Sequence, residues 1–259
     1  MTTTWNAVVL AGDRGDKDPV AKAARVYGKA AATFDNISLI ERVVGALSRS
    51  DSIDKIFTLG PTQSCLDQHP DVNDVLNQYG VKILSPDKGP SASALRGVLA
   101  SGHYPTLVVT CDLPLLEPLM IDNYCRQLMN VDADFVVGAI DYSLISEKMA
   151  PLKKTKYQFN EQAVCFANLF AVLKPQGMKA IEYWQSVEDS RKKPLELVRK
   201  IDWLSILRYK LGRLSLEQVA TKLSKKVDAN VVVENFSVPE LAIDVDSAHD
   251  YEVLSAYLK

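Results

Sequence analysis

Residues 5–15 read WNAVVLAGDRG, an apolar run that ends in a loop of small and charged residues. The apolar part, from Trp5 to Ala11, predicts a buried strand, and similar runs rich in Val, Ile and Phe recur along the chain. Segments with apolar residues at helical spacing, such as 38–47, separate these runs. Strands separated by helices of this length predict βαβ units, and therefore an α/β fold with a mostly parallel sheet and helices on both faces.

The remaining elements follow the same alternation up to about residue 140. Further strands are predicted at 55–59, 81–85, 106–111, 135–139, 162–173 and 231–234. Helices are predicted at 63–79 with an interruption near Pro70, at 91–100 with Ser91 as N-cap, at 118–129 and at 247–258. Residues 146–160 are polar and rich in Lys, and we expect a mobile loop there. We expect one domain over residues 1–259, with a helical insert at about 176–226 and Gly212 between two of its helices.

Composition restricts the class of protein. The 259 residues hold 30 Lys and Arg against 32 Asp and Glu, a net charge of -2. A chain that binds nucleic acid over its whole surface is more basic, so no nucleic-acid partner is expected. The four cysteines form no C-x-x-C pair, which argues against a zinc ribbon and fits a reducing compartment. We find no signal peptide and no apolar run near the ~20 residues that cross a bilayer, so we expect a cytoplasmic protein without membrane contact.

The loop after the first strand suits a polyphosphate. Its small residues let the backbone approach a ligand and present N–H groups, and its basic residues add charge. The residues concerned are Leu10, Ala11, Gly12, Asp13, Arg14 and Gly15, followed by Gly28 and Lys29. Ligands of open α/β sheets bind beyond the carboxyl ends of the strands, where this loop lies. It matches neither a Walker A loop nor the dinucleotide glycine pattern, and an ordinary polar loop is the alternative.

Two acidic segments complete the candidate site. Residues 107–116 read LVVTCDLPLL, so an apolar strand delivers Asp112 to its carboxyl end, where a carboxylate can hold Mg²⁺ against a nucleotide phosphate. Residues 241–254 read LAIDVDSAHDYEVL, in which Asp244 and Asp246 alternate along a short predicted strand and face the same side. The alternatives are structural: Asp112 caps the turn before the next helix, and Asp246 or Ser247 caps the last helix.

These three segments resemble the motifs of the MobA-like, nucleotide-diphospho-sugar transferase superfamily of nucleotidyltransferases. The resemblance rests on LAG-x-R-G with a later G-K, on the D-x-P of 112–114 and on the D-V-D of 244–246. It covers most of the chain and implies a Rossmann-like, three-layer α/β/α fold of the GT-A type with a mixed sheet. Asp13 stands where the family usually has a second glycine. Because a carboxylate repels phosphate, Asp13 is expected to face the ribose, a basic side chain or a metal.

The resemblance implies transfer of a nucleoside monophosphate from an NTP, with CTP or GTP favoured, to a phosphorylated small-molecule acceptor, with release of pyrophosphate. It assigns Arg14 and Lys29 to the phosphates and Asp112, with Asp246 or Asp244, to Mg²⁺, with Mn²⁺ as a second candidate. A phosphate nucleophile is already anionic, so no His or Ser base is required. Catalysis then rests on positioning and on charge neutralisation, in a monomer or a homodimer.

Further substrate contacts are implied with weaker support. Gly89, Ser91 and Ser93 resemble the segment that reads the base, and a plain capped turn is the alternative. Asn168 resembles a residue of the acceptor pocket, or it is a hydrogen-bonded core asparagine. Arg191 and Lys192 either contact an acceptor phosphate or belong to a solvated surface.

Two other functions stay open. A non-catalytic nucleotide-binding or regulatory protein of the same fold is favoured by the acidic Asp13 in the phosphate loop. A metal-dependent glycosyltransferase would use a nucleotide sugar and a D-x-D motif after the fourth strand. The chain has the single carboxylate of Asp112 there.

Overall fold

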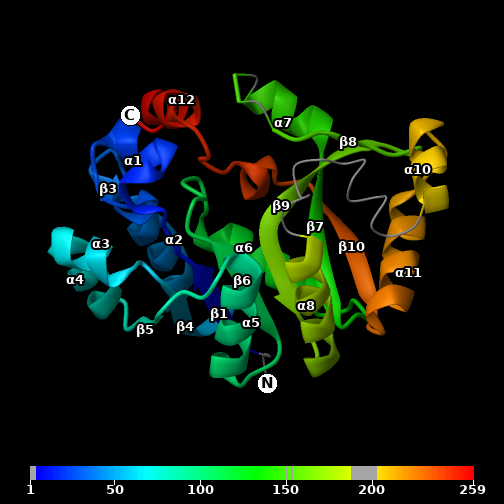
Figure 1. Cartoon of the computed structure of the whole chain (residues 1–259), viewed down its shortest axis with the longest axis horizontal. Coiled ribbons are helices and arrows are strands. Elements are labelled where there is room, and N and C mark those ends of the chain that lie inside the picture. The colour runs from blue at the N-terminus through cyan, green and yellow to red at the C-terminus, as the bar shows by residue number, and fades with distance from the viewer. Residues whose placement is uncertain (1–3, 150, 153, 188–202) are drawn as a thin grey trace.

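The computed structural model describes residues 4–149, 151–152, 154–187 and 203–259 (Figure 1). At its centre is an 8-stranded sheet with strand order β10-β7-β9-β6-β1-β4-β5, in which β8 pairs with β9 alone. Strand β9 runs antiparallel to its neighbours β6, β7 and β8, and the other neighbouring strands are parallel. The predicted α/β fold with a mostly parallel, mixed sheet is therefore confirmed.

The strands of this sheet are β1 (Trp5–Leu10), β4 (Ile53–Leu59), β5 (Lys82–Leu84), β6 (Thr106–Thr110), β7 (Phe135–Asp141), β8 (Tyr157–Gln158), β9 (Ala163–Val172) and β10 (Val231–Phe236). A separate pair is formed by β2 (Thr33–Phe34) and β3 (Ile37–Ser38). The α-helices are α1 (Pro19–Ala24), α2 (Leu39–Ser48), α3 (Gln63–Gln68), α4 (Pro70–Gln78), α5 (Pro90–Ser101), α6 (Pro118–Leu128), α7 (Tyr142–Lys148), α8 (Met178–Val187), α10 (Trp203–Lys210), α11 (Leu216–Val227) and α12 (Ala248–Tyr257). Short 3₁₀ turns are η1 (Gly15–Lys17), η2 (Lys29–Ala31), η3 (Pro175–Gly177) and η5 (Pro239–Ala242).

Helices cover both faces of the sheet. Successive residues of β1 point to opposite faces, so Ala7 and Val9 join the core cluster of α2 and α6 while Val8 joins that of α5 and α8. Both faces of the central strands are therefore buried, which explains why these strands appear in the sequence as continuous apolar runs. Figure 1 looks onto the face of this sheet, with the strand labels running from β10 on the right to β5 on the left.

The strand order places a topological switch point between β1 and β6. From β1 the chain moves outward through β4 and β5, then returns to β6 on the opposite side of β1. Where connections diverge in this way, the loops at the carboxyl ends of the two strands separate and leave room for a ligand. The amide of Cys111 donates to the carbonyl of Leu10 at 3.1 Å, so the two loops start side by side.

Three local predictions are wrong. Helix α5 begins at Pro90 with Gly89, not Ser91, as N-cap, because proline suits the first helical position. The predicted mobile loop at 146–160 includes the end of α7, whose N-terminus is capped by Asp141, and it also includes β8. The predicted strand carrying Asp244 and Asp246 is absent from the described chain, since η5 ends at 242 and irregular backbone leads into α12.

The described elements between β9 and β10 are η3, α8, α10 and α11, joined by short turns and irregular backbone. Helices α10 and α11 are separated at Gly212, as predicted, and Ala180 and Ile181 of α8 share a core cluster with Val98 of α5. The assignment of residues 1–259 to one domain stays a prediction. Within the described ranges, no helix is both long enough and apolar enough to cross a membrane.

Candidate functional site

Three carboxylates meet near the switch point between β1 and β6. Asp112, Asp244 and Asp246 each offer an oxygen within 4.8 Å of the others. Asp112 follows β6, whereas the other two lie between η5 and α12. The amide of Val245 donates to the carbonyl of Asp112 at 3.0 Å, and the Val245 side chain is buried. This hydrogen bond holds the two acidic segments together, and Asp244 and Asp246 are the residues on either side of the buried Val245.

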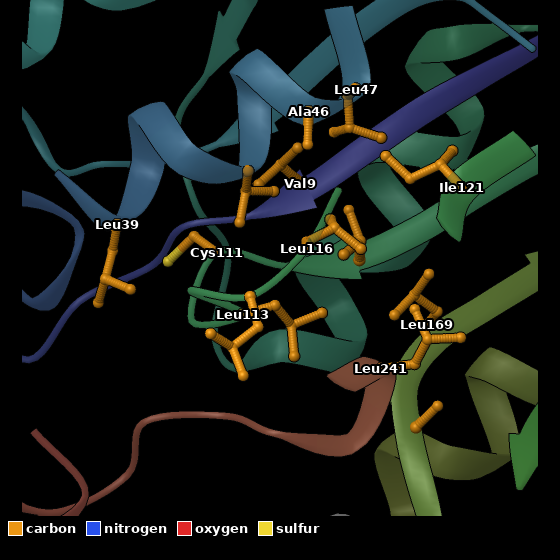
Figure 2. Packing of buried hydrophobic residues seen from close by; sticks show 14 of the residues in the cluster. Val9, Leu39, Ala46, Leu47, Cys111, Leu113, Leu116, Ile121, Leu169 and Leu241 are labelled. Carbon is orange, nitrogen blue, oxygen red and sulfur yellow. The ribbon is translucent and has the colours of Figure 1, made fainter. Parts of the chain in front are cut away.

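Core packing beneath the carboxylates fixes the two segments. Leu113 and Leu116, in the turn after β6, lie in the same buried cluster as Leu241 of η5 and Leu169 of β9 (Figure 2). Leu113 and Leu241 are almost fully buried. The apolar residues that flank each acidic position thus bring together aspartates more than 130 residues apart in the sequence.

Lys29 lies among these carboxylates. Its Nζ donates to Asp112 Oδ2 at 2.6 Å and to Asp246 Oδ1 at 3.3 Å, and its side chain is 12% exposed. Burial disfavours the ammonium form, but the charges of Asp112 and Asp246 outweigh this effect and raise the pKa of Lys29 well above its usual value. Lys29 is therefore a permanent positive charge at the site.

The second oxygen of Asp112 is different. Asp112 Oδ1 is buried, and it has no hydrogen-bond partner among the described residues. Buried carboxylate oxygens normally have donors, because desolvation without compensation costs free energy. A cation is the partner whose chemistry fits such an oxygen beside two further carboxylates.

Asp244 is held by two side chains. Lys154 Nζ donates to both the carbonyl oxygen and Oδ1 of Asp244, and Asn168 Nδ2 donates to Oδ2 at 2.9 Å. Burial raises the pKa of the Asp244 carboxyl above its usual value, and Lys154 opposes this rise. Sequence reasoning missed Lys154, because the Lys-rich stretch around it is typical of a solvated loop. Asn168 is half-buried on β9 and reaches the acidic cluster.

The loop after β1 is organised by Asp13, whose carboxylate oxygens both accept hydrogen bonds from within the protein. Its Oδ1 accepts from the Gly15 amide at 2.8 Å, and its Oδ2 accepts from the amide and hydroxyl of Thr62 at 3.1 and 2.9 Å. The carboxylate thus binds donors within the protein and fixes the loop against the end of β4. The neighbouring residue, Arg14, is exposed to solvent.

The C-terminal end of the loop after β1 is also held by residues that follow β4. The Tyr27 amide donates to His69 Nε2 at 3.0 Å, and the Cys65 thiol donates to the Tyr27 carbonyl at 3.0 Å. Burial raises the pKa of Cys65 to about 12, so this thiol stays protonated and remains a donor. Gly28 follows with a φ of 89°, and Lys29 begins η2.

We expect Gly28→Ala to destabilise the protein and displace Lys29. A Cβ there would lie 2.8 Å from Cys65 Sγ and 3.3 Å from Asp13 Cγ, in a backbone region that costs other residues ~1–3 kcal/mol. Thermal unfolding should show a loss of about 2 kcal/mol or more. Gly12→Ala, which places a Cβ 3.7 Å from Pro86, should change stability by less than ~0.5 kcal/mol.

A third variant separates strain from steric contact. Gly80 has a φ of 63° and open space around its missing Cβ, so Gly80→Ala should cost only about 1 kcal/mol. If Gly28→Ala costs no more than Gly80→Ala, the contact between Gly28, Cys65 and Asp13 does not shape the loop.

The segment predicted to read the base is partly occupied by structural contacts. Ser93 Oγ accepts from the Asp87 amide at 2.9 Å, and Ser91 and Ser93 are both buried in α5. Gly89 is exposed with a φ of 91°. Nearby, a cavity of about 540 Å³ lies beyond the ends of β4 and β5, lined by residues that include Thr62, Ser85 and Pro86.

The structure brings five of the predicted site residues to one place. Lys29, Asp112, Asn168, Asp244 and Asp246 form one connected set of contacts. Leu10 and Ala11 have structural main-chain contacts. The Leu10 carbonyl accepts from the Cys111 amide, and the Ala11 amide donates to the Leu59 carbonyl. Arg191 and Lys192 lie outside the described residues.

This open sheet, with an acidic cluster beside the loop after β1, fits the class of nucleotidyltransferases whose motifs the sequence resembles. Residues 7–187 match the MobA-like NTP transferase domain, and the chain belongs to this family. The resemblance seen in the sequence is thereby confirmed.

Solved structures agree on the fold. The chain is similar to a hypothetical transferase from Thermus thermophilus, with a TM-score of 0.75 at 22% identity, covering 96% of this chain and 100% of the other. It is also similar to 4-diphosphocytidyl-2C-methyl-D-erythritol synthase from Anaerococcus prevotii, with a TM-score of 0.55, 14% identity, and coverage of 100% and 99%. A third similar structure is CTP:phosphocholine cytidylyltransferase from Streptococcus pneumoniae. Its TM-score is 0.56 at 13% identity, and the match covers 99% of this chain and 100% of the other. No curated protein matches the sequence.

Proposed function

We propose that the enzyme transfers a nucleoside monophosphate from CTP to a phosphorylated small-molecule acceptor and releases pyrophosphate. The observation that carries the proposal is the difference in surroundings between the two carboxylate oxygens of Asp112. Its Oδ2 accepts from Lys29, while its buried Oδ1 lacks a donor among the described residues. The choice of CTP over GTP is supported by the cytidylyl group in the names of two similar structures.

Mg²⁺ fits this site, and Mn²⁺ fits the same donor set. Hard divalent cations take carboxylate oxygens, and Asp112 and Asp246 offer them within 4.8 Å of each other. When bound, the ion would polarise the α-phosphate and neutralise the developing charge. We assign Asp112 and Asp246 as its ligands.

The chain's own residues would supply positioning and charge. Lys29 is fixed by two carboxylates at 2.6 and 3.3 Å and presents its ammonium where the phosphates approach. The main-chain N–H groups of residues 12–14 and the exposed Arg14 side chain would contact the β- and γ-phosphates. The acceptor phosphate is itself the nucleophile, so the site needs no general base. The cavity beyond β4 and β5 is a fitting place for the base.

Pyrophosphate release tests the proposal. The purified protein is mixed with each NTP and Mg²⁺ in the presence of a panel of phosphorylated sugars, alcohols and amino alcohols. We expect pyrophosphate with CTP and at least one acceptor, and none without Mg²⁺. Thermal stabilisation by CTP without turnover across the panel would favour the nucleotide-binding alternative. Turnover of a nucleotide sugar instead would favour the glycosyltransferase.

A further inference from the structure

Two consecutive peptide groups just before Lys29 are held by side chains of α3 and of its C-cap residue. The amide of Tyr27 donates to Nε2 of His69 at 3.0 Å, and the carbonyl of Tyr27 accepts from the Cys65 thiol at 3.0 Å. Gly28 follows with a φ of 89°, and Lys29 then begins η2. The direction in which the chain enters η2 therefore depends on these two hydrogen bonds.

The bond to His69 sets the protonation state of its imidazole ring. Because an N–H group donates to Nε2, this nitrogen carries no proton, and the neutral ring has its proton on Nδ1. The other two histidines of the chain, His103 and His249, differ in this respect. Their Nε2 atoms lie 2.8 and 3.1 Å from the carbonyl oxygens of Thr4 and Pro151, and a carbonyl oxygen requires the ring to donate. Protonation preserves those two contacts and removes the acceptor at His69.

The loop after β1, α3 and α4 all contribute titratable groups around this contact. Burial, followed by the charges of Asp13 and Asp71, raises the pKa of the Cys65 thiol to about 12, so the thiol stays protonated. Within five residues of Tyr27 or His69 along the chain, the further charged side chains are Lys22, Arg25, Lys29, Asp67 and Asp74. Of all these side-chain types, only imidazole ordinarily changes its charge between pH 5 and 8. A change at this contact within that range is therefore due to His69.

We propose that His69 is a positioning residue for Lys29, and that its protonation releases the Tyr27 amide and loosens the segment that presents Lys29 to the phosphates. This inference rests on the proposed function. In the cationic ring both nitrogens are donors, so an N–H group would face the Tyr27 N–H and the hydrogen bond is lost. The Cys65 thiol still holds the Tyr27 carbonyl, which makes the release local and reversible. Activity therefore falls as the pH falls.

NMR tests the contact without any turnover. At pH 8, long-range ¹H–¹⁵N spectra should show the proton of the His69 ring on Nδ1. Between pH 8 and 5, the protection factor of the Tyr27 amide against hydrogen exchange should fall by at least about fivefold, the equivalent of one neutral hydrogen bond. In His69→Gln the side-chain carbonyl can accept from the same amide and does not titrate, so protection should be retained. A ring proton on Nε2 at pH 8 would overturn the inference.

Kinetics connects the contact to the site. The ratio of kcat/KM for CTP between wild type and His69→Gln is measured from pH 8 to 5, because the substrate phosphates titrate in the same range and cancel in the ratio. We expect this ratio to be lower at pH 5 than at pH 8 by at least about fivefold. His69→Leu, which has no acceptor, should be slower than wild type at pH 8 by a similar factor. His103→Gln is the matched control, and its ratio to wild type should not change with pH.

Failure of the inference and failure of the proposed function give different results. If the ratio of wild type to His69→Gln is constant between pH 5 and 8, or if His103→Gln removes as much of the acid loss, His69 does not position Lys29 and only the inference is overturned. If the wild-type chain turns over no NTP, the proposed function is overturned, and the ring proton and the Tyr27 protection factor decide whether His69 holds the loop. Thermal unfolding checks that each variant folds, and if His69→Leu does not, His69→Gln decides.

Discussion

Asp112→Asn is expected to lower nucleotidyl transfer by about 10²–10³-fold, the cost of removing one preorganised charge-stabilising group. The substitution keeps the shape of the side chain but removes the negative charge that Lys29 would share with the proposed cation. The amide cannot replace both oxygens, since Oδ2 faces the Lys29 ammonium at 2.6 Å and Oδ1 is buried. Pyrophosphate release measures the loss, and the Mg²⁺ dependence of CTP affinity should vanish with it.

The fold should survive this change. Lys29 keeps Asp246 as a partner, and the leucines beneath the site are untouched. Asp132→Asn is a suitable control, because Asp132 pairs with Lys174 at 2.8 Å on the surface, away from the acidic cluster. It should leave both activity and metal dependence unchanged. Wild-type turnover in Asp112→Asn would remove Asp112 from the metal site.

The central strands and Asp112 could be predicted because their signals are local. A run such as LVVTC is apolar on both faces, and the first polar residue beyond it must lie at the strand's carboxyl end. Gly12 could be placed in the same way, because it is the first residue after the apolar run that forms β1. These elements carry their burial pattern in consecutive residues, so no knowledge of distant contacts was needed.

The contacts of the site could not be predicted in the same way. Asp13 binds Thr62, which lies 49 residues further on, and the argument from phosphate repulsion did not foresee donors within the protein. Lys154 points inward only because the residues around it are tied to Tyr142 and α12. Asn168 has features of both expected roles, the acceptor-pocket residue and the hydrogen-bonded core asparagine. It is on a core strand, yet its side chain donates to Asp244 of the acidic cluster. Tertiary contacts decide such cases.

Lys29→Met is expected to lower the free energy of unfolding by about 3 kcal/mol, in the range for breaking a buried ion pair. Without the ammonium, three carboxylates lie within 4.8 Å of one another with no cation at Lys29's position to offset their repulsion. Methionine has nearly the same length and apolar stem, so the loss reports charge rather than volume. Lys174→Met provides the comparison. It removes the lysine of an exposed pair at 2.8 Å, which should cost less than ~1 kcal/mol.

Added Mg²⁺ should distinguish this explanation from simple misfolding. A dication that neutralises the cluster replaces the missing charge, so Mg²⁺ should raise the unfolding temperature of Lys29→Met by more than it raises that of wild type. A variant that Mg²⁺ does not stabilise would show that the three carboxylates do not form a cation site. CTP affinity should fall as well, since the ammonium that we propose contacts the phosphates is gone.

The dependence on pH follows from the raised pKa of Lys29. A lysine whose pKa is higher in the folded than in the unfolded state contributes its full stabilisation below the unfolded value of about 10.4 and loses it as pH rises through the folded value. The stability difference between wild type and Lys29→Met should therefore be constant from neutral pH to about pH 9 and shrink only above about pH 10.4. A difference that disappears between pH 7 and 9 would mean that Lys29 is not held as an ammonium by Asp112 and Asp246, and its role at the phosphates would lose its basis.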